Sequence, residues 1–149
     1  MSFEEIVEVI EHAFKLELKV VQDTTVFEVA SEDGGTKVRV LVQYEDGRCL
    51  LSADLGEPPP EGGEKLLRVM LEANNLFVAT AGATLALDAA TGVCRLQRHM
   101  LQDEFAGDAE AKLVTFIETA LFWGRAIADF RPPVENEEKH SDDFRMMQV

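Results

Sequence analysis

The chain has 149 residues and a mass of 16.5 kDa, which fits one domain with a single sizeable core. Its 28 Asp and Glu residues against 14 Lys and Arg residues give a net charge of −14, and such a surface repels nucleic-acid phosphates and anionic lipids. We therefore expect neither nucleic acid nor a membrane as a partner. The sequence has no apolar run of 18 residues and no basic, apolar leader, so we expect a cytoplasmic protein.

An amphipathic helix is predicted to begin directly after Ser2. Ser2 and Glu5 have the spacing of a capping box, in which each side chain bonds the other residue's backbone N–H. Apolar residues then recur at helical spacing on one stripe, and acidic residues occupy the opposite side. The stripe expected to face the rest of the protein consists of Phe3, Ile6, Val7, Ile10 and Phe14.

Three antiparallel strands are predicted next, over residues 24–30, 36–44 and 48–55. The second of the two turns that join them contains Asp46-Gly47, a strong hairpin signal. Apolar and polar residues alternate along each strand, so each strand has one buried face and one wetter face. On the second strand the expected buried face consists of Val38, Val40, Val42 and Tyr44.

Leu41 and Leu50 interrupt this alternation, because both fall on the polar side of neighbouring strands. Two outward leucines on adjacent strands make an apolar strip on which a partner could dock. Alternatively, a helix of the same chain covers that face, and both leucines belong to the core. The exposure of the two side chains distinguishes these interpretations.

The second half of the chain is predicted to add a helix over residues 64–75, a strand over 82–88 and a returning strand over 93–100. A run of three prolines at 58–60 separates this part from the preceding strand. Gly92 sits in the turn between the last two strands, where a positive φ is needed.

The last predicted helix follows a polar crossover at residues 102–107 and is capped by Asp108. Gly124 within its apolar face indicates close approach of another element. That face consists of Leu113, Phe116, Ile117, Ala120, Leu121, Gly124 and Ile127, and Phe122 and Trp123 are expected to widen it.

These elements predict an α+β fold with a single antiparallel twisted sheet of about five strands and three helices, in the order α-β-β-β-α-β-β-α. Residues 1–131 are expected to form one domain. Residues 132–149 are polar with few apolar anchors, and we expect them to be a flexible tail.

No pattern in the sequence points to catalysis. The three histidines, His12, His99 and His140, lack the spacing of a metal site, and phosphate-binding loops and nucleophile elbows are absent. Cys49 and Cys94 fall among apolar neighbours on predicted strands, and we expect buried free thiols, because cytosolic disulfides are rare. We therefore expect no enzymatic activity, no cofactor and no metal.

One stretch resembles a known family. Leu71-Glu72-Ala73-Asn74 is followed by a short apolar link, then by Gly82-Ala83-Thr84-Leu85-Ala86-Leu87-Asp88 and the returning strand to Leu101. This order is similar to that of the Tir chaperone family, the class I chaperones of bacterial type III secretion. The likeness is close over about forty residues. The chain departs from the family in having Ala81-Gly82 where two glycines are common, and in its extended tail.

The resemblance implies a homodimer without catalytic activity or cofactor. Such a dimer holds an extended N-terminal segment of a secreted effector protein and keeps it competent for export. By this likeness the dimer contact would be formed by the apolar face of the helix at 64–75, the adjoining Leu76-Phe77 and the strand at 82–88. Its candidate residues are Leu67, Met70, Leu71, Phe77 and Leu85. The effector would contact Val7, Ile10, Phe14, Phe27, Val29, Val38 and Val40, and the strip of Leu41 and Leu50 is a further candidate.

A second interpretation stays open, because a fold does not determine a function. The chain could be a regulatory or adaptor domain of the same fold that binds a folded partner and has no secretion client. A neighbouring gene for a secretion apparatus or an effector would favour the chaperone interpretation.

Overall fold

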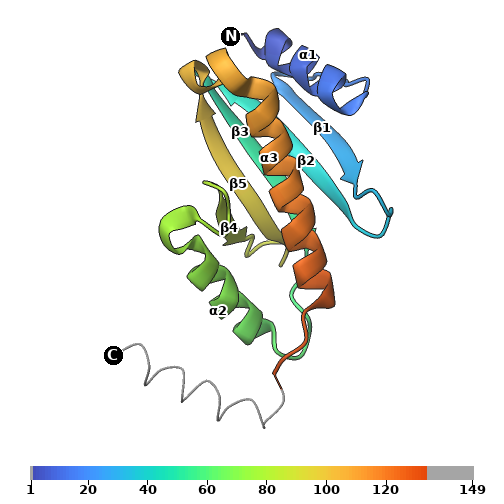
Figure 1. Ribbon diagram of the computed structural model, residues 1–149, viewed down its shortest axis with the longest axis vertical. Coiled ribbons are helices and arrows are strands. Elements are labelled where there is room, and N and C mark those ends of the chain that lie inside the picture. Colours follow the sequence, from blue (N-terminus) through green and yellow to red (C-terminus); the bar gives the residue numbers. More distant parts are fainter. Residues whose placement is uncertain (1, 134–149) are drawn as a thin grey trace.

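The computed structural model describes residues 2–133 (Figure 1). The sequence beyond them, which includes most of the predicted tail, lies outside the described residues. Within the described part, three α-helices and a five-stranded antiparallel sheet form an α+β fold with the predicted order of elements. The elements are α1 (Phe3–Phe14), β1 (Thr24–Ala30), β2 (Lys37–Glu45), β3 (Arg48–Gly56), α2 (Gly63–Asn74), the 3₁₀ turn η1 (Asn75–Phe77), β4 (Thr84–Leu87), β5 (Cys94–Leu101) and α3 (Gln102–Asp129).

Helix α1 begins with the predicted capping box. The Ser2 Oγ accepts a hydrogen bond from the Glu5 N–H at 3.2 Å, and the Glu5 carboxylate accepts one from the Ser2 N–H at 3.2 Å. The helix ends at Lys15, whose backbone is left-handed with φ 54°. Its predicted stripe faces inward, with Phe14 half-buried at the end and Phe3, Ile6, Val7 and Ile10 buried.

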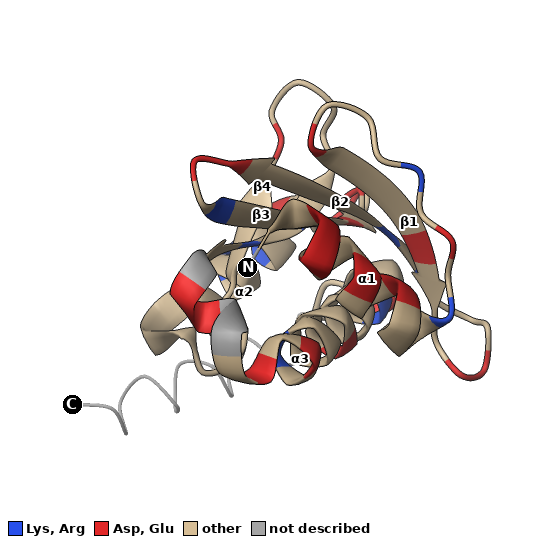
Figure 2. Ribbon diagram, turned by 90° about the horizontal axis from the view of Figure 1, so that it is seen from above, with Lys and Arg blue, Asp and Glu red and all other residues tan. Residues whose placement is uncertain are grey.

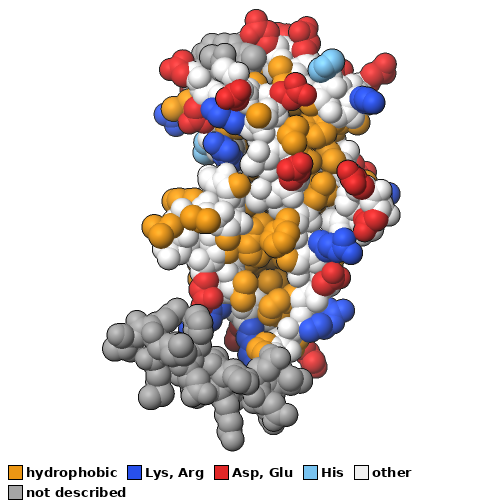
Figure 3. All heavy atoms as spheres, viewed as in Figure 1, with side chains coloured by type: hydrophobic (Ala, Val, Ile, Leu, Met, Phe, Trp, Pro, Cys, Tyr) orange, Lys and Arg blue, Asp and Glu red, His pale blue; other side chains and the backbone are white. Residues whose placement is uncertain are grey.

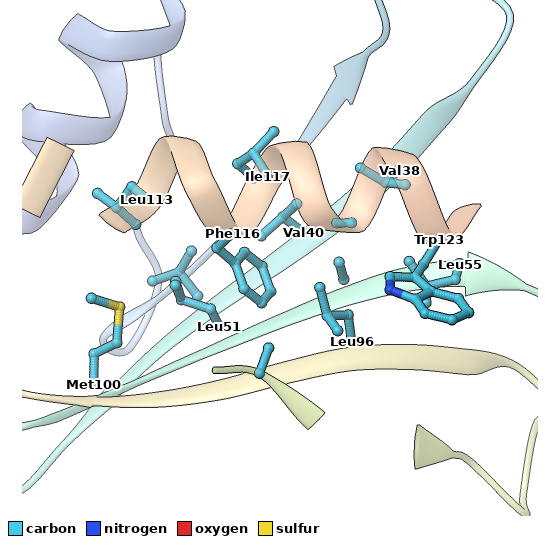
Figure 4. Close-up of a cluster of buried hydrophobic side chains, with 14 of the residues drawn as sticks. Val38, Val40, Leu51, Leu55, Leu96, Met100, Leu113, Phe116, Ile117 and Trp123 are labelled. Atoms are coloured by element: carbon cyan, nitrogen blue, oxygen red, sulfur yellow. The ribbon is translucent and has the colours of Figure 1, made fainter. Parts of the chain in front are cut away.

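The sheet has the strand order β1-β2-β3-β5-β4, so β1 and β4 are its edges. Helix α3 lies across the middle strands and buries one face of the sheet (Figures 1 and 4). A Cβ at Gly124 would lie 3.2 Å from the Val38 Cγ1, which confirms the predicted close approach. Figure 4 shows the core between helix and sheet, where side chains of Leu113, Phe116, Ile117 and Trp123 meet those of Val38, Val40, Leu51, Leu96 and Met100.

Two predictions about α3 were wrong. Residues 102–107 are helical and not a polar crossover, so α3 begins at Gln102. Asp108, with non-helical φ −141° and ψ 40°, marks a kink, and the long part of the helix follows it as predicted. Phe122 does not widen the buried face, because 65% of it is exposed. Its neighbour Trp123 takes the inward position and donates its indole N–H to the Ala79 carbonyl at 3.1 Å. Successive helical residues point about 100° apart, so the two rings cannot both face the core.

Asn74 joins α2 to the edge strand β4. Its side-chain oxygen accepts a hydrogen bond from the Leu85 N–H at 2.8 Å, and its amide donates to the Leu85 carbonyl at 3.0 Å. The side chain thus makes the two bonds that a further strand would make at this position. This arrangement explains physically why an Asn that ends a helix and the strand after it belong to one motif.

The two cysteines are free and buried, as predicted. Burial raises the pKa of the Cys49 thiol to about 12, and it also raises the pKa of the Cys94 thiol. Since the thiolate is the reactive form, we expect both cysteines to resist alkylation by iodoacetamide in the native protein at about pH 8 and to react fully in denaturant. Mass spectrometry of the treated protein measures this. Rapid native modification of Cys49 would show that the β2–β3 region opens.

The β4–β5 turn depends on Asp88. Its carboxylate accepts a hydrogen bond from the Ala90 N–H at 3.0 Å and pairs with Arg95 at 2.9 Å. The Ala90 hydrogen bond, followed by contributions from Thr91 and Arg95, lowers the pKa of Asp88 below its usual 3.8. A group with a lowered folded pKa stabilises the protein above its unfolded pKa, and this stability is lost as the pH falls through the folded value.

We therefore expect acid to destabilise the wild type more than an Asp88→Asn variant, because Asn keeps the acceptor for the Ala90 N–H but does not titrate. The measurement is the melting temperature of both proteins between about pH 5 and about pH 2. Parallel acid curves for the two proteins would contradict the assigned role of the carboxylate.

Candidate partner-binding surfaces

The side chains predicted to contact an effector divide into two groups. Phe14, Val29, Leu41 and Leu50 are half-buried and reach the surface. The others are enclosed between the sheet and the helices, and no partner reaches them in the folded chain; they are Val7, Ile10, Phe27, Val38 and Val40. The alternation along β2 had predicted Val38 and Val40 on the buried face, which the structure confirms; their assignment to the effector came from the family resemblance.

All three helices lie on one side of the sheet, and the opposite face carries no helix (Figures 1 and 2). We call this helix-free side the outer face. Leu41 and Leu50 lie on it and are half-buried, so they are not core residues beneath a helix, and their outer sides remain open to a partner. Val26, which is exposed and lies opposite Leu41 in the register, extends the strip to the edge strand β1.

The two edges of the sheet differ in their availability. At β4 the backbone of Leu85 is occupied by Asn74. At β1 the preceding segment covers only the start of the strand, through a bridge between Val21 and Thr24 and a hydrogen bond from the Thr25 hydroxyl to the Lys19 carbonyl. Among the described residues, nothing pairs with the free edge from residue 26 to residue 30. An extended segment can add to the sheet there.

The predicted dimer residues also divide into two groups. Met70 and Leu85 are buried within the chain, and Leu67 is half-buried. Leu71 and Phe77 are 72% and 51% exposed. They are joined by Leu76 at 79% exposure, which belongs to the predicted contact, and by Val78 at 83% exposure, which was not predicted. We call these four exposed side chains the η1 surface, and Figure 3 shows hydrophobic side chains protruding beside the end of α2.

The backbone beneath the η1 surface is unusual. Leu76 and Phe77 both have a positive φ, of 61° and 56°, a region that large side chains avoid. Each residue in this conformation raises the free energy of the folded state by on the order of 1 kcal/mol or more. The apolar side chains of these residues also face water. A covering partner would remove that exposed apolar area. The signal in the sequence was the run Leu76-Phe77-Val78 in a turn, where polar residues are usual.

The electrostatics of the molecule are uneven. Figure 2 shows Asp and Glu residues along α1 and around β1, with few Lys and Arg residues among them. The part of the chain that the structure describes has no group of three or more His, Cys, Asp or Glu residues that could hold a metal ion. In the same part, no helix combines the length and the apolar character needed to cross a membrane.

Comparison with known proteins identifies the family. The sequence profile of the Tir chaperone protein (CesT) family matches residues 21–124. The chain belongs to this family. The matched region runs from just before β1 into α3, so it includes the whole sheet, the η1 surface and the outer face. No curated protein sequence is significantly similar to the chain.

Three solved structures share the fold at low sequence identity. A chain from the HopA1–SchA chaperone–effector complex superposes with a TM-score of 0.62 at 16% identity, over 86% of this chain and 94% of that one. A chain from the ExsC–ExsE complex gives 0.58 at 19% identity, over 83% and 91%. A chain from the heterodimeric ExoU–SpcU complex of the Pseudomonas aeruginosa type III secretion system gives 0.59 at 17% identity, over 82% and 93%.

Proposed function

We propose that this protein is a non-catalytic, cytoplasmic chaperone that binds an extended N-terminal segment of a secreted effector and keeps it competent for type III secretion. The observation that carries the proposal is the family match over residues 21–124. Two of the similar structures are described as a chaperone–effector complex and as part of a type III secretion system. The exposed apolar strip on the outer face is what such a function requires.

The proposed working unit is a homodimer formed through the η1 surface. Leu71, Leu76, Phe77 and Val78 would be buried against the same residues of a second copy, because symmetric dimers use one self-complementary patch. Leu67 borders this contact, while Met70 and Leu85 support it from beneath. The high negative charge would keep the free dimer soluble despite its other apolar surface.

Residues 1–131 would form the binding domain, and residues 132–149 would be an appended flexible tail. Pro132 lies against the start of α2, since a Cβ at Gly62 would be 2.7 Å from the Pro132 Cβ. The tail would therefore leave the domain beside the N-terminus of that helix.

The protein would bind the unfolded state of the client more tightly than its folded state. The client's apolar side chains would be buried on Leu41 and Leu50 of the outer face and, past the edge strand, on the half-buried Phe14 and Val29 of the helix side. Its backbone would add to the free edge of β1. Val7, Ile10, Phe27, Val38 and Val40 would underlie this surface without touching the client. The gain from buried area offsets the conformational entropy that the client loses on becoming ordered.

We expect a Leu41→Asp, Leu50→Asp variant to lose the client while remaining folded, because both side chains lie on the uncovered face. The test is deletion of the gene in the host, with quantitative proteomics of secreted and cellular protein. The proposal predicts that one secreted protein is lost, and that the wild-type chain restores it while the double variant does not. An unchanged set of secreted proteins after deletion would favour an adaptor that binds a folded partner.

A further inference from the structure

The outer face contains a hollow whose chemistry differs from the rest of the strip. Ser52 on the central strand β3 is only 4% exposed, although no helix covers it. The hollow has a volume of about 210 Å³ and is lined by Val26, Arg39, Leu41, Ser52, Asp54 and Arg95. We call it the Ser52 hollow. An enclosed cavity of about 150 Å³ holds a benzene ring, so this open hollow has room for one large side chain.

The strand register explains why the hollow lies there. One row across the outer face contains Val26, Leu41, Ser52 and Gln97, and the small Ser52 leaves a gap between larger neighbours. The adjacent row contains Glu28, Arg39, Asp54 and Arg95, which alternate in charge. The hollow therefore has an apolar wall on the side of β1 and β2 and a charged rim along the second row.

Most polar groups around the hollow already have partners within the chain. The Ser52 hydroxyl accepts a hydrogen bond from the Gln97 amide at 3.2 Å. The Asp54 carboxylate accepts one from Arg95 at 2.9 Å, and Arg95 also pairs with Asp88. An apolar side chain can therefore enter the hollow without leaving these groups unpaired, which would be the main cost of burying it.

Arg39 is the exception. Among the residues that the structure describes, its guanidinium makes no ion pair and no side-chain hydrogen bond. It is a cation on the rim of an apolar hollow, in a chain where acids outnumber bases two to one. A carboxylate from outside the chain would complement it, because Arg binds carboxylates with two parallel hydrogen bonds.

We propose that the Ser52 hollow receives one large apolar side chain of the bound segment, and that Arg39 binds a carboxylate two residues away in the same segment. This inference rests on the proposed binding of an extended client and specifies its chemistry. In an extended chain, residues i and i+2 point to the same side about 7 Å apart, so one segment can reach both the hollow and its rim. The recognised pattern is an apolar residue and an Asp or Glu separated by one residue, in either order.

A client segment is the occupant that the charges favour over a second copy of this chain. The three most exposed large apolar side chains among the described residues, Leu71, Leu76 and Val78, lie on the η1 surface, whereas the outer face has a mixed row of charges around one small hollow. The hollow is also continuous with Leu41 and Val26, and thus with the free edge of β1 where an extended segment can add.

The test is selection of a phage-displayed random dodecapeptide library on the full-length protein, followed by fluorescence anisotropy with one enriched synthetic peptide. We expect enrichment of the spaced apolar–acidic pair. Ser52→Leu fills the hollow and should weaken binding of the peptide at least tenfold. Arg39→Glu should weaken it similarly, and replacing the acidic residue of the peptide by Lys should restore binding to that variant alone.

Two matched variants control for folding and for added bulk. Ser52→Ala keeps the hollow open, and Glu118→Leu adds an apolar side chain on the exposed side of α3, away from the outer face, so both should bind the peptide with nearly wild-type affinity. Absence of the spaced pair among selected peptides, or unchanged affinity in Ser52→Leu and Arg39→Glu, would overturn the inference. If Ser52→Leu and Arg39→Glu keep their affinity for the peptide and also restore secretion in the deletion strain, the chaperone function stands and only the assignment of the hollow is wrong.

Discussion

Replacement of Leu71 and Phe77 by glutamate should convert the dimer into a folded monomer. Both side chains are largely exposed in the single chain, so the substitutions should lower the stability of the folded monomer only slightly. Burial of a Leu or Phe side chain contributes about 1.5–3 kcal/mol, and each substitution acts twice in a symmetric dimer. The added charges would also be buried without partners. We expect the dissociation constant to rise by at least about a thousandfold.

Size-exclusion chromatography with light scattering measures this change. The wild type should have a mass of about 33 kDa, twice the 16.5 kDa of the chain, and the double variant about 16.5 kDa. Val20→Glu is the matched control, because Val20 is also an exposed apolar residue but precedes β1 and lies outside the η1 surface. A monomeric wild type, or a double variant that remains a dimer, would show that the η1 surface is not the dimer contact.

Asn74→Ala should be among the most destabilising single substitutions of a partly buried polar residue in this protein. It removes both hydrogen bonds to the Leu85 backbone and leaves an N–H and a carbonyl of a buried residue without partners. Lost hydrogen bonds and unsatisfied polar groups together predict a decrease of about 2–4 kcal/mol in the free energy of unfolding. Urea denaturation followed by circular dichroism provides the measurement.

Two further variants make this result specific. Asn75→Ala changes the same residue type one position later, where the side chain is exposed and makes no side-chain hydrogen bond within the described residues, so we expect a change within about 0.5 kcal/mol. Asn74→Asp keeps the acceptor for the Leu85 N–H but loses the donor to the Leu85 carbonyl. Its free energy of unfolding should therefore lie between those of the wild type and Asn74→Ala. Equal stability of Asn74→Ala and the wild type would remove the physical explanation for the helix–strand motif.

Local rules in the sequence predicted the elements of this fold well. The capping box at Ser2, the Asp46-Gly47 turn and the strict alternation along β2 each depend on neighbours within a few residues. Leu41 and Leu50 were correctly separated from the inward residues, because successive side chains along a strand point to opposite faces of the sheet. The order of the elements along the chain followed from the same local patterns, whereas the order of the strands within the sheet, β1-β2-β3-β5-β4, did not.

The remaining features depend on packing between elements that are distant in the sequence. The alternation along β2 predicted that Val38 is buried and that Leu41 points the other way, but whether a helix also covers the Leu41 face depends on where the helices pack. Phe122 and Trp123 cannot both face the core, and Trp123 takes the inward position, where its indole N–H reaches the Ala79 carbonyl. The exposure of Leu76 follows from a left-handed turn that its side chain alone would not favour.

The central claim is that the protein holds an unfolded segment of a client, and its most direct test is the composition and contact map of the native complex. The tagged chain would be purified from its own host, cross-linked, and analysed by light scattering and mass spectrometry. We predict two copies of the chain with one larger protein, whose cross-links come only from its N-terminal segment and reach the outer face and β1. Cross-links from a folded domain of the partner, or a chain that carries no partner at all, would contradict the account.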